Sequence, residues 1–288
     1  MSSEPRLVWP VGAELGEGPV WCADEAALRF VDIKGGRLHR FAPATGACDT
    51  YEVGGQPSFI VRVAEGGFLV GSGHALFRFD GQTLGEAVAV VAMPHHNRTN
   101  DATVDTTGRL WFGTMDDNEQ IATGALHRFD RGTLQTSEWT ACVTNGPAIS
   151  SNGRTLYHVD SGARTIWRIP LDQGSLAPSG EVFLRIDEAD GYPDGVVVDS
   201  EDCLWVALWD GWGVRRYSPD GALLFQVDLP CARVTKVAFG GPDLRTAYVT
   251  TARTGLDAAA LAAQPLAGGL FAFDAPAAGR LLPAVKLA

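Results

Sequence analysis

The chain has 288 residues, of which 45% are hydrophobic, 9% aromatic and 20% charged, and its formal net charge is −11. This composition is typical of a globular protein with enough apolar residues to fill a large core. Nucleic acids and anionic membrane surfaces both attract basic patches, so the acidic balance argues against either kind of partner.

The cysteines and the N-terminal segment predict a cytoplasmic protein. The N-terminal residues lack the basic and apolar stretches of a secretory signal, and no apolar run reaches the ~18 residues of a membrane-spanning helix. The cysteines are odd in number and scattered, at Cys22, Cys48, Cys142, Cys203 and Cys231. That arrangement favours free thiols over a disulfide framework or a cysteine zinc site.

One apolar strand pattern recurs six times along the chain. Its copies begin at Leu28, Phe68, Leu110, Leu156, Leu204 and Ala247. A second strand follows each copy, and turn residues such as Asp80-Gly81 follow most of these. Six copies leave about 48 residues for each, which is the length of a four-stranded propeller blade. The sequence therefore predicts an all-β fold, a six-bladed β-propeller with four antiparallel strands per blade, as a single domain over residues 1–288.

The two ends of the chain offer alternative ways to close the ring. The stretch Arg6–Trp9 is expected to complete the last blade as its outer strand, and a strand near Leu281–Leu287 could serve instead. Helical periodicity is almost absent. One short helix is predicted over Ala258–Ala263, with Asp257 as its N-cap.

The residue before each innermost strand should point into the central channel at one end. The six positions hold Glu17, Pro57, Asn100, Asn145, Asp194 and Thr235. Four of them carry side-chain oxygens of the kind that bind hard divalent cations. Asn and Asp before a strand are also common turn residues, but their recurrence at one blade position favours a shared site.

The short sequence motifs around these positions resemble those of a known family. They are Gly16-Glu17-Gly18-Pro19, Asn97-Arg98-Thr99-Asn100-Asp101, Thr144-Asn145-Gly146-Pro147 and Tyr192-Pro193-Asp194-Gly195. Together they resemble the sugar-lactone hydrolases of the gluconolactonase, senescence-marker-protein (regucalcin) and luciferin-regenerating-enzyme family, from about Glu14 to Gly269. The resemblance implies a six-bladed propeller with one divalent metal in the channel, bound by Glu17, Asn145 and Asp194. It also implies substrate contacts from Arg98 and Asn100.

Two loops on the same side of the predicted ring bear on substrate choice. In the loop after Met115, the acidic substrate contact of the family falls on Asn118, with Asp116 and Asp117 beside it. This departure leaves the exact sugar contact open. A second loop carries Trp209 and Trp212, which could stack on a sugar ring or simply pack within the loop.

Other chemical motifs are missing or have a structural explanation. His95 and His96 precede Arg98 in a predicted loop, and His158 falls on a predicted strand, so we expect none of the three to be catalytic. The sequence has no Gly-x-Ser-x-Gly nucleophile motif, no Gly-x-Gly-x-x-Gly motif and no P-loop.

The sequence thus predicts a hydrolase of carboxylic ester bonds that acts in sugar catabolism. Its substrate would be a small-molecule aldonolactone, such as xylono-, arabinono- or gluconolactone, and we expect a monomer. The cofactor would be one divalent ion, with calcium, zinc, manganese, magnesium and iron(II) left open. Asp194 is the candidate general base. Two alternatives are another metal-dependent esterase or organophosphatase on the same scaffold, and a non-enzymatic calcium-binding propeller.

Overall fold

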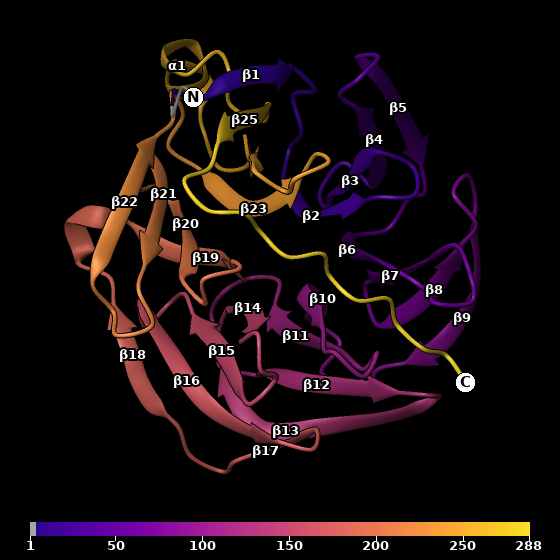
Figure 1. Cartoon of the computed structure of the whole chain (residues 1–288). Helices are drawn as coiled ribbons and strands as arrows, with labels where there is room; N and C mark the ends of the chain where they lie inside the picture. Colours follow the sequence, from indigo (N-terminus) through magenta and orange to yellow (C-terminus); the bar gives the residue numbers. More distant parts are fainter. Residues whose placement is uncertain (1–3) are drawn as a thin grey trace.

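The computed structural model describes residues 4–288, whose strands form six antiparallel sheets arranged in a ring (Figure 1). The predicted six-bladed propeller is confirmed. Residues 1–3, part of the segment in which no secretory signal was found, lie outside the described residues. Among residues 4–288, no helix is long and apolar enough to cross a membrane.

In the first five blades the strands follow one another in sequence from the inside of the ring outward, whereas the sixth takes its outer strand from the start of the chain. The first three blades are β2 (Gly16–Cys22), β3 (Ala27–Asp32), β4 (Arg37–Ala42) and β5 (Ala47–Glu52); β6 (Pro57–Arg62), β7 (Phe68–Ser72), β8 (Ala75–Phe79) and β9 (Leu84–Val90); and β10 (Asn97–Val104), β11 (Leu110–Asp116), β12 (Gly124–Asp130) and β13 (Thr133–Ala141). The fourth is β14 (Thr144–Ile149), β15 (Thr155–Asp160), β16 (Thr165–Asp172), β17 (Ser175–Leu176) and β18 (Glu181–Arg185). The last two are β19 (Tyr192–Val198), β20 (Leu204–Trp209), β21 (Gly213–Tyr217) and β22 (Leu223–Asp228); and β23 (Val234–Gly240), β24 (Thr246–Thr251), β25 (Leu270–Asp274) and β1 (Arg6–Trp9).

The fourth blade departs from the predicted four strands. Its outer edge is shared by the short β17 and by β18, which both pair with β16. The segment between these two strands contains Pro178, which has no amide hydrogen to give to a sheet, and Gly180. The outer strand is therefore interrupted there.

Burial distinguishes the inner strands from the outer ones. Every residue of β2, β10 and β23 is buried, whereas the outer strand β5 alternates between exposed and half-buried residues. The core lies between neighbouring blades. Trp205 is fully buried and contacts the rings of Phe225, Phe239 and Phe273, with ring centroids 5.4–6.0 Å apart. This contact joins blades five and six.

The first strand of the chain closes the ring, as predicted. β1 pairs antiparallel with β25, with Leu7 opposite Phe271, and so becomes the outer strand of the sixth blade. The predicted short helix is also present as α1 (Ala258–Ala263), where the Asp257 side chain accepts a hydrogen bond from the amide of Ala260. A single 3₁₀ turn, η1 (Glu188–Asp190), precedes β19. The five cysteines are free thiols.

The alternative outer strand near Leu281–Leu287 does not form, because β1 already occupies that edge. Instead residues 275–287, the C-terminal strap, cross the ring on the side where the inner strands end (Figure 1). Hydrogen bonds tie the strap to five blades. They run from Gly279 to Leu244, from Ser200 to Ala278, from Arg280 to Ile149, from Val285 to Arg62 and from Lys286 to Gly108. It therefore covers that end of the channel, which we call the rear.

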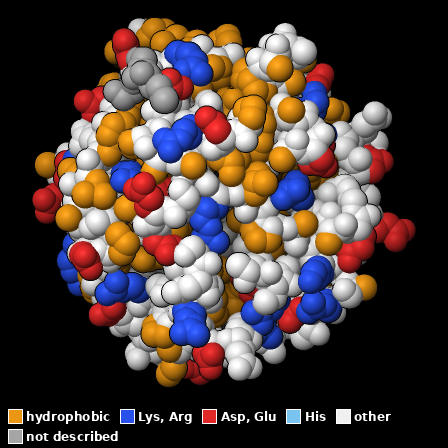
Figure 2. All heavy atoms as spheres, in the orientation of Figure 1, with side chains coloured by type: hydrophobic (Ala, Val, Ile, Leu, Met, Phe, Trp, Pro, Cys, Tyr) orange, Lys and Arg blue, Asp and Glu red, His pale blue; other side chains and the backbone are white. Residues whose placement is uncertain are grey.

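The surface on the side drawn in Figure 2 mixes charges. Lys and Arg side chains lie scattered among Asp and Glu side chains there, with apolar atoms between them. On that face, the basic residues do not gather into one broad patch.

Val285 anchors the strap and offers a test of its contribution. Val285 is fully buried beside Val63, whereas Leu281 of the same strap is 43% exposed. Val285→Ala should reduce the free energy of unfolding by about 2 kcal/mol, because buried methyl groups are lost and a cavity remains. Leu281→Ala should cost clearly less. Thermal denaturation of both variants checks this, and equal losses would show that the strap is not anchored at Val285.

Candidate functional site

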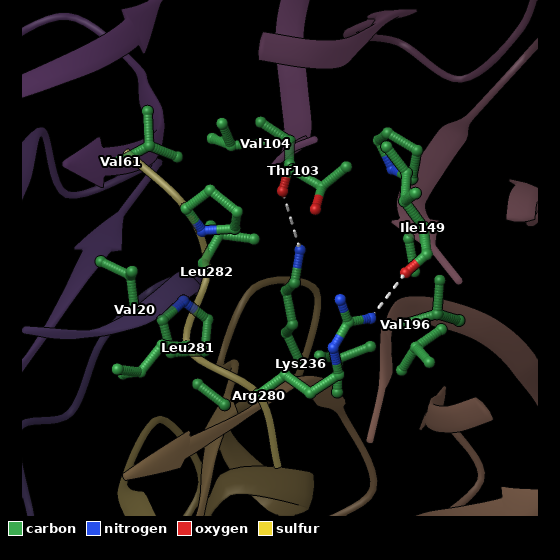
Figure 3. Close-up of a pocket in the computed structure, with 18 of the residues that line it drawn as sticks. Val20, Val61, Thr103, Val104, Ile149, Val196, Lys236, Arg280, Leu281 and Leu282 are labelled. Carbon is green, nitrogen blue, oxygen red and sulfur yellow. Dashed lines mark hydrogen bonds between the residues drawn. The ribbon is translucent and has the colours of Figure 1, made fainter. Parts of the chain in front are cut away.

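Two cavities occupy the two ends of the channel. The front pocket, about 340 Å³, lies where the inner strands begin, and its walls include Glu17, Arg98, Asn145 and Asp194. The rear cavity is only about 90 Å³ and lies under the strap, between apolar side chains of the inner strands and Leu282 (Figure 3). Several polar groups converge in the larger cavity, which makes the front pocket the candidate site.

Five of the expected site residues lie in the first half of the innermost strand of a blade. Glu17 is the second residue of β2, Asn145 the second of β14 and Asp194 the third of β19, while Arg98 and Asn100 belong to the first half of β10. All five side chains line the front pocket. The structure thus brings together residues that are far apart in sequence.

A break in strand pairing next to each of these residues explains their orientation. The register shifts between Glu17 and Val20 in the first blade, and again in β10, β14 and β19 at the matching positions. Such a bulge bends a strand and redirects a side chain. Gly18 follows Glu17 and Gly146 follows Asn145, and their φ values of +52° and +67° are ones that an L side chain rarely adopts.

A chain of hydrogen bonds fixes the amide side chains across three blades. Arg98 Nη1 donates to Asn100 Oδ1 at 2.6 Å, and Asn100 Nδ2 donates to Asn145 Oδ1 at 2.9 Å. Asn145 Nδ2 donates to Ser161 Oγ at 3.0 Å, and this hydroxyl donates to the carbonyl of Pro193 at 2.7 Å. Because the second lone pair of Asn145 Oδ1 stays free of these bonds, the oxygen can also bind a cation.

Two carboxyl groups deep in the front pocket, those of Glu17 and Asp194, are buried and have raised pKa values. Glu17 and Asp194 are each 6% exposed. Burial, followed by the nearby charge of Asp101, raises the pKa of Glu17 to about 8. Burial, followed by the charge of Glu17, raises the pKa of Asp194 well above its usual range. Buried charges are normally paired or bound to a metal, so this pair is suited to a cation.

The donor set fits one divalent cation. Glu17 and Asp194 supply carboxylate oxygens and Asn145 supplies an amide oxygen, the hard ligands that such ions prefer. Within the described part of the chain, no three His, Cys, Asp or Glu side chains form a metal-binding group. The amide oxygen of Asn145 is therefore needed as the third ligand, and water would complete the shell.

A buried ion pair lies behind these carboxyl groups. The ammonium of Lys236 donates to the carboxylate of Asp101, and both side chains are less than a tenth exposed. The positive charge of Lys236 opposes the rise in the pKa of both Glu17 and Asp194 without cancelling it. The Lys236 side chain reaches into the rear cavity (Figure 3). The pair thus lies between the two ends of the channel and offsets part of the negative charge.

The loop between β11 and β12 places its acidic groups differently from the sequence-based expectation. Asp117 and Glu119 line the front pocket, whereas Asn118 is not among its described lining residues. The amide and side chain of Asn118 bond to the buried carboxylate of Asp116, which also accepts the amides of Gln120 and Ile121. Asp116 therefore shapes the loop from inside, and Glu119, with φ of +58°, turns toward the pocket.

The remaining candidates, two tryptophans and three histidines, also differ in whether they line the front pocket. Trp209 lines the pocket, with the Arg233 guanidinium 4.9 Å from its ring centroid, whereas Trp212 is 46% exposed and is absent from the described lining. His95 and His96 also lie outside that lining. His158 is buried on β15.

Comparisons with known proteins agree with the observed fold. The profile described as the SMP-30/gluconolactonase/LRE-like region matches residues 15–253. The chain belongs to this family. It is 38% identical over 274 residues to a pentonolactonase of Haloferax volcanii, covering 92% of each chain, and 37% identical to a 6-deoxy-6-sulfogluconolactonase of Pseudomonas putida, covering 90% of each.

Solved structures of this family have nearly the same backbone. A calcium-binding protein, regucalcin, from Agrobacterium tumefaciens gives a TM-score of 0.93 at 28% identity, covering 98% of this chain and 97% of that one. A luciferin-regenerating enzyme gives 0.90 at 30% identity, covering 98% and 99%. The resemblance inferred from the motifs is therefore confirmed.

Several pocket residues escaped the sequence analysis, and three of them carry polar side chains on comparable loops. Lys34, Glu119 and Ser161 line the front pocket from loops that follow β3, β11 and β15. All three loops join the second and third strands of a blade, and these connections lie on the side where the inner strands begin. That shared position is the one sequence signal that could have identified them.

The raised pKa values predict how the stability of the metal-free protein varies with pH. The pKa of Glu17 is about 8 in the folded protein, against 4.5 for a glutamate in the unfolded chain. Between these pH values the folded state therefore binds more protons than the unfolded state. Stability that depends on those protons is lost as the pH rises. Burial lowers the pKa of His39, His127 and His158 to about 4, so they act in the opposite direction, but only below pH 6.5.

The melting temperature of the metal-free protein should therefore fall between pH 6.5 and 8. Thermal denaturation after chelation, repeated at several pH values, measures this dependence. Glu17→Gln, which has no proton to lose, should flatten the curve. A wild-type melting temperature that stays constant or rises across this window would mean that the two carboxyl groups are already ionised.

Proposed function

We propose that the protein is a metal-dependent sugar lactonase that hydrolyses an aldonolactone to the aldonic acid. The observation that carries this proposal is the front pocket itself. There two buried carboxyl groups and an amide oxygen from three blades lie beside Arg98 and Asn100. The relatives named pentonolactonase and 6-deoxy-6-sulfogluconolactonase support a pentono- or hexonolactone as the substrate class.

The residues that would hold the cation are Glu17, Asn145 and Asp194. A divalent ion bound there would supply Lewis-acid polarisation of the lactone carbonyl. Oxygen ligands of this type accept several divalent ions, so calcium, zinc, manganese, magnesium and iron(II) all remain candidates. The free thiols support a reducing, cytoplasmic setting for the enzyme.

Asp194 is placed to move the proton of the reaction. In the hydrolysis, a water oxygen bonds to the acyl carbon and the bond from that carbon to the ring oxygen breaks. Asp194 would accept the proton of the attacking water and return it to the ring oxygen, which leaves as a hydroxyl group. Beside a divalent cation the ionised form of Asp194 would be favoured, so at neutral pH it could accept this proton.

Arg98 and Asn100 would orient the substrate. Both are buried at the pocket wall, and their mutual hydrogen bond keeps the guanidinium in one place. A guanidinium donates several hydrogen bonds in a fixed plane, which suits neighbouring sugar hydroxyls and the carboxylate that forms. The pocket volume of about 340 Å³ also lies within the ~300–1,000 Å³ range of small-molecule sites.

Metal removal tests the proposal directly. Protein treated with a chelator should open pentono- and hexonolactones no faster than water alone, and adding back at least one divalent ion should restore turnover. Spontaneous hydrolysis must be subtracted in every assay. Full activity of the stripped protein would exclude the metal requirement.

A calcium-binding protein without turnover is the second candidate, favoured by the regucalcin structure named as calcium-binding. It predicts cation binding by calorimetry but no hydrolysis with any ion. A panel that adds aryl esters and organophosphates to the lactones would detect another hydrolase on the same scaffold. Turnover confined to lactones would exclude both alternatives.

Replacement of Asp194 separates a catalytic role from a turn-forming one. Asp194→Asn keeps the size and one oxygen but removes the charge and the base, so kcat should fall by about 10²–10⁴-fold under metal saturation. The melting temperature should stay close to that of the wild type, because the side chain lies in the pocket rather than between blades. A folded, metal-loaded variant with nearly normal activity would show that Asp194 is only a turn residue.

A further inference from the structure

Asp117 collects three hydrogen bonds from three different blades. Its Oδ1 accepts from Lys34 Nζ at 2.6 Å and from Arg98 Nε at 2.7 Å, and its Oδ2 accepts from Gln56 Nε2 at 3.0 Å. Lys34 follows a strand of the first blade, Gln56 directly precedes the second blade, and Arg98 lies in the third. These contacts join residues up to 83 positions apart in the sequence.

The surroundings of Asp117 keep it charged. Burial acts to raise its pKa, but the hydrogen bonds from Lys34, Gln56 and Arg98 outweigh burial and lower the pKa to about 2. The group is therefore a carboxylate at any ordinary pH. Its oxygens already have donors, so a sugar hydroxyl would have to compete with two cationic partners for them.

Arg98 depends on Asp117 for its position. The described residues engage its guanidinium through Nε, which donates to Asp117, and through Nη1, which donates to Asn100 Oδ1 and to the carbonyl of Thr99. Two bonds on different nitrogens fix both the position and the plane of the group. The guanidinium edge that remains, at Nη2, is the one available to a ligand in the pocket.

We propose that Asp117 is a positioning residue, which holds Arg98 in the orientation that binds the lactone and does not itself contact the substrate. This role rests on the proposed lactonase function. Glu119, the other acidic residue of this loop at the pocket, has no such bond to Arg98 among the described residues, so the role belongs to Asp117. The division also explains why the loop carries adjacent acidic residues with different surroundings.

Loss of the Asp117 carboxylate should impair substrate binding more than the chemical step. Without it, Arg98 keeps only its Nη1 contacts, and a displaced guanidinium binds the lactone poorly in both ground and transition states. Asp117→Ala should therefore lower kcat/KM by about 10–100-fold, mainly through a higher KM. Cation affinity should stay unchanged, since Asp117 contacts none of the three proposed ligands.

A double-mutant cycle tests whether Asp117 acts through Arg98. The proteins are wild type, Asp117→Ala, Arg98→Ala and the double variant, assayed as full-length, metal-loaded enzyme. If Asp117 only positions Arg98, its replacement in the Arg98→Ala background should change kcat/KM by no more than about twofold. Effects that multiply instead would overturn the proposal, because Asp117 would then contribute to catalysis independently of Arg98.

Three further measurements keep the test decisive. Asp49→Ala, which removes a carboxylate paired with Arg40 on the outer strand β5, is a matched control and should leave kcat/KM unchanged. Asp117→Asn keeps the side-chain size and replaces Asp117→Ala in the cycle if that variant fails to fold. Titration calorimetry with the metal alone should give the same affinity for all variants, and a loss as large as that in kcat/KM would overturn the proposal.

The outcomes separate this proposal from the function on which it rests. An active wild type with multiplicative effects would reject only the positioning role of Asp117. A wild type that opens no lactone with any metal would reject the lactonase function and the positioning role together. An active wild type with a strongly non-additive cycle supports both.

Discussion

The cost of holding two carboxyl groups in one buried pocket governs the architecture of the front of this propeller. Glu17 and Asp194 come from different blades, burial raises the pKa of both, and the charge of Glu17 raises that of Asp194 further. Isolated buried charges are strongly unfavourable, so the protein must either keep these groups protonated or supply positive charge. Lys236 supplies some from behind, although it is already paired with Asp101. The remaining imbalance is what a divalent cation would relieve.

Such a site needs a rigid frame, and the ring provides it at its closure points. β1 completes the sixth blade with residues from the start of the chain, so separation of the ring at this seam requires breaking a sheet. The strap adds hydrogen bonds across the rear and buries Val285. Together with the Lys236–Asp101 pair, it blocks the rear end of the channel. Ligands therefore reach the site from the front, where the loops between the second and third strands vary in length.

Residues borne by strands were the predictable part of this structure. A repeat of about 48 residues indicated six blades, and the shared register of Glu17, Asn100, Asn145 and Asp194 indicated that they meet. The structure brings these four into one pocket because a strand position translates directly into a place around the axis. The closing strand was predictable for the same reason, although the choice between the two chain ends needed the observed pairing.

Residues borne by loops were not predictable in this way. Counting along the loop after Met115 led to Asn118, with Asp116 and Asp117 beside it. In the structure Glu119 adopts a positive φ and Asp116 binds the loop backbone, so of these candidates only Asp117 lines the pocket, together with Glu119. The contacts from Lys34 and Gln56 to Asp117 cross blade boundaries over 83 and 61 residues, and no local pattern encodes them. In the sequence, the apolar stretch near Leu282 likewise resembled a strand. Its hydrogen-bond partners are instead scattered over five blades, and no local pattern indicates them.

This difference between strands and loops also suggests how one fold serves several substrates. Asn100 links the strand-borne groups because it accepts from Arg98 and donates to Asn145. The residues proposed to bind the substrate and the cation therefore form one hydrogen-bonded unit. Asn100 is the residue that bonds to both Arg98 and Asn145, so a change there would reach both groups. A change in the loop that carries Asp117 and Glu119 alters only what Arg98 can reach and which substituents fit. Relatives of similar identity are named for a pentonolactone and for a sulfur-substituted gluconolactone, which is the variation that such loops permit around a constant centre.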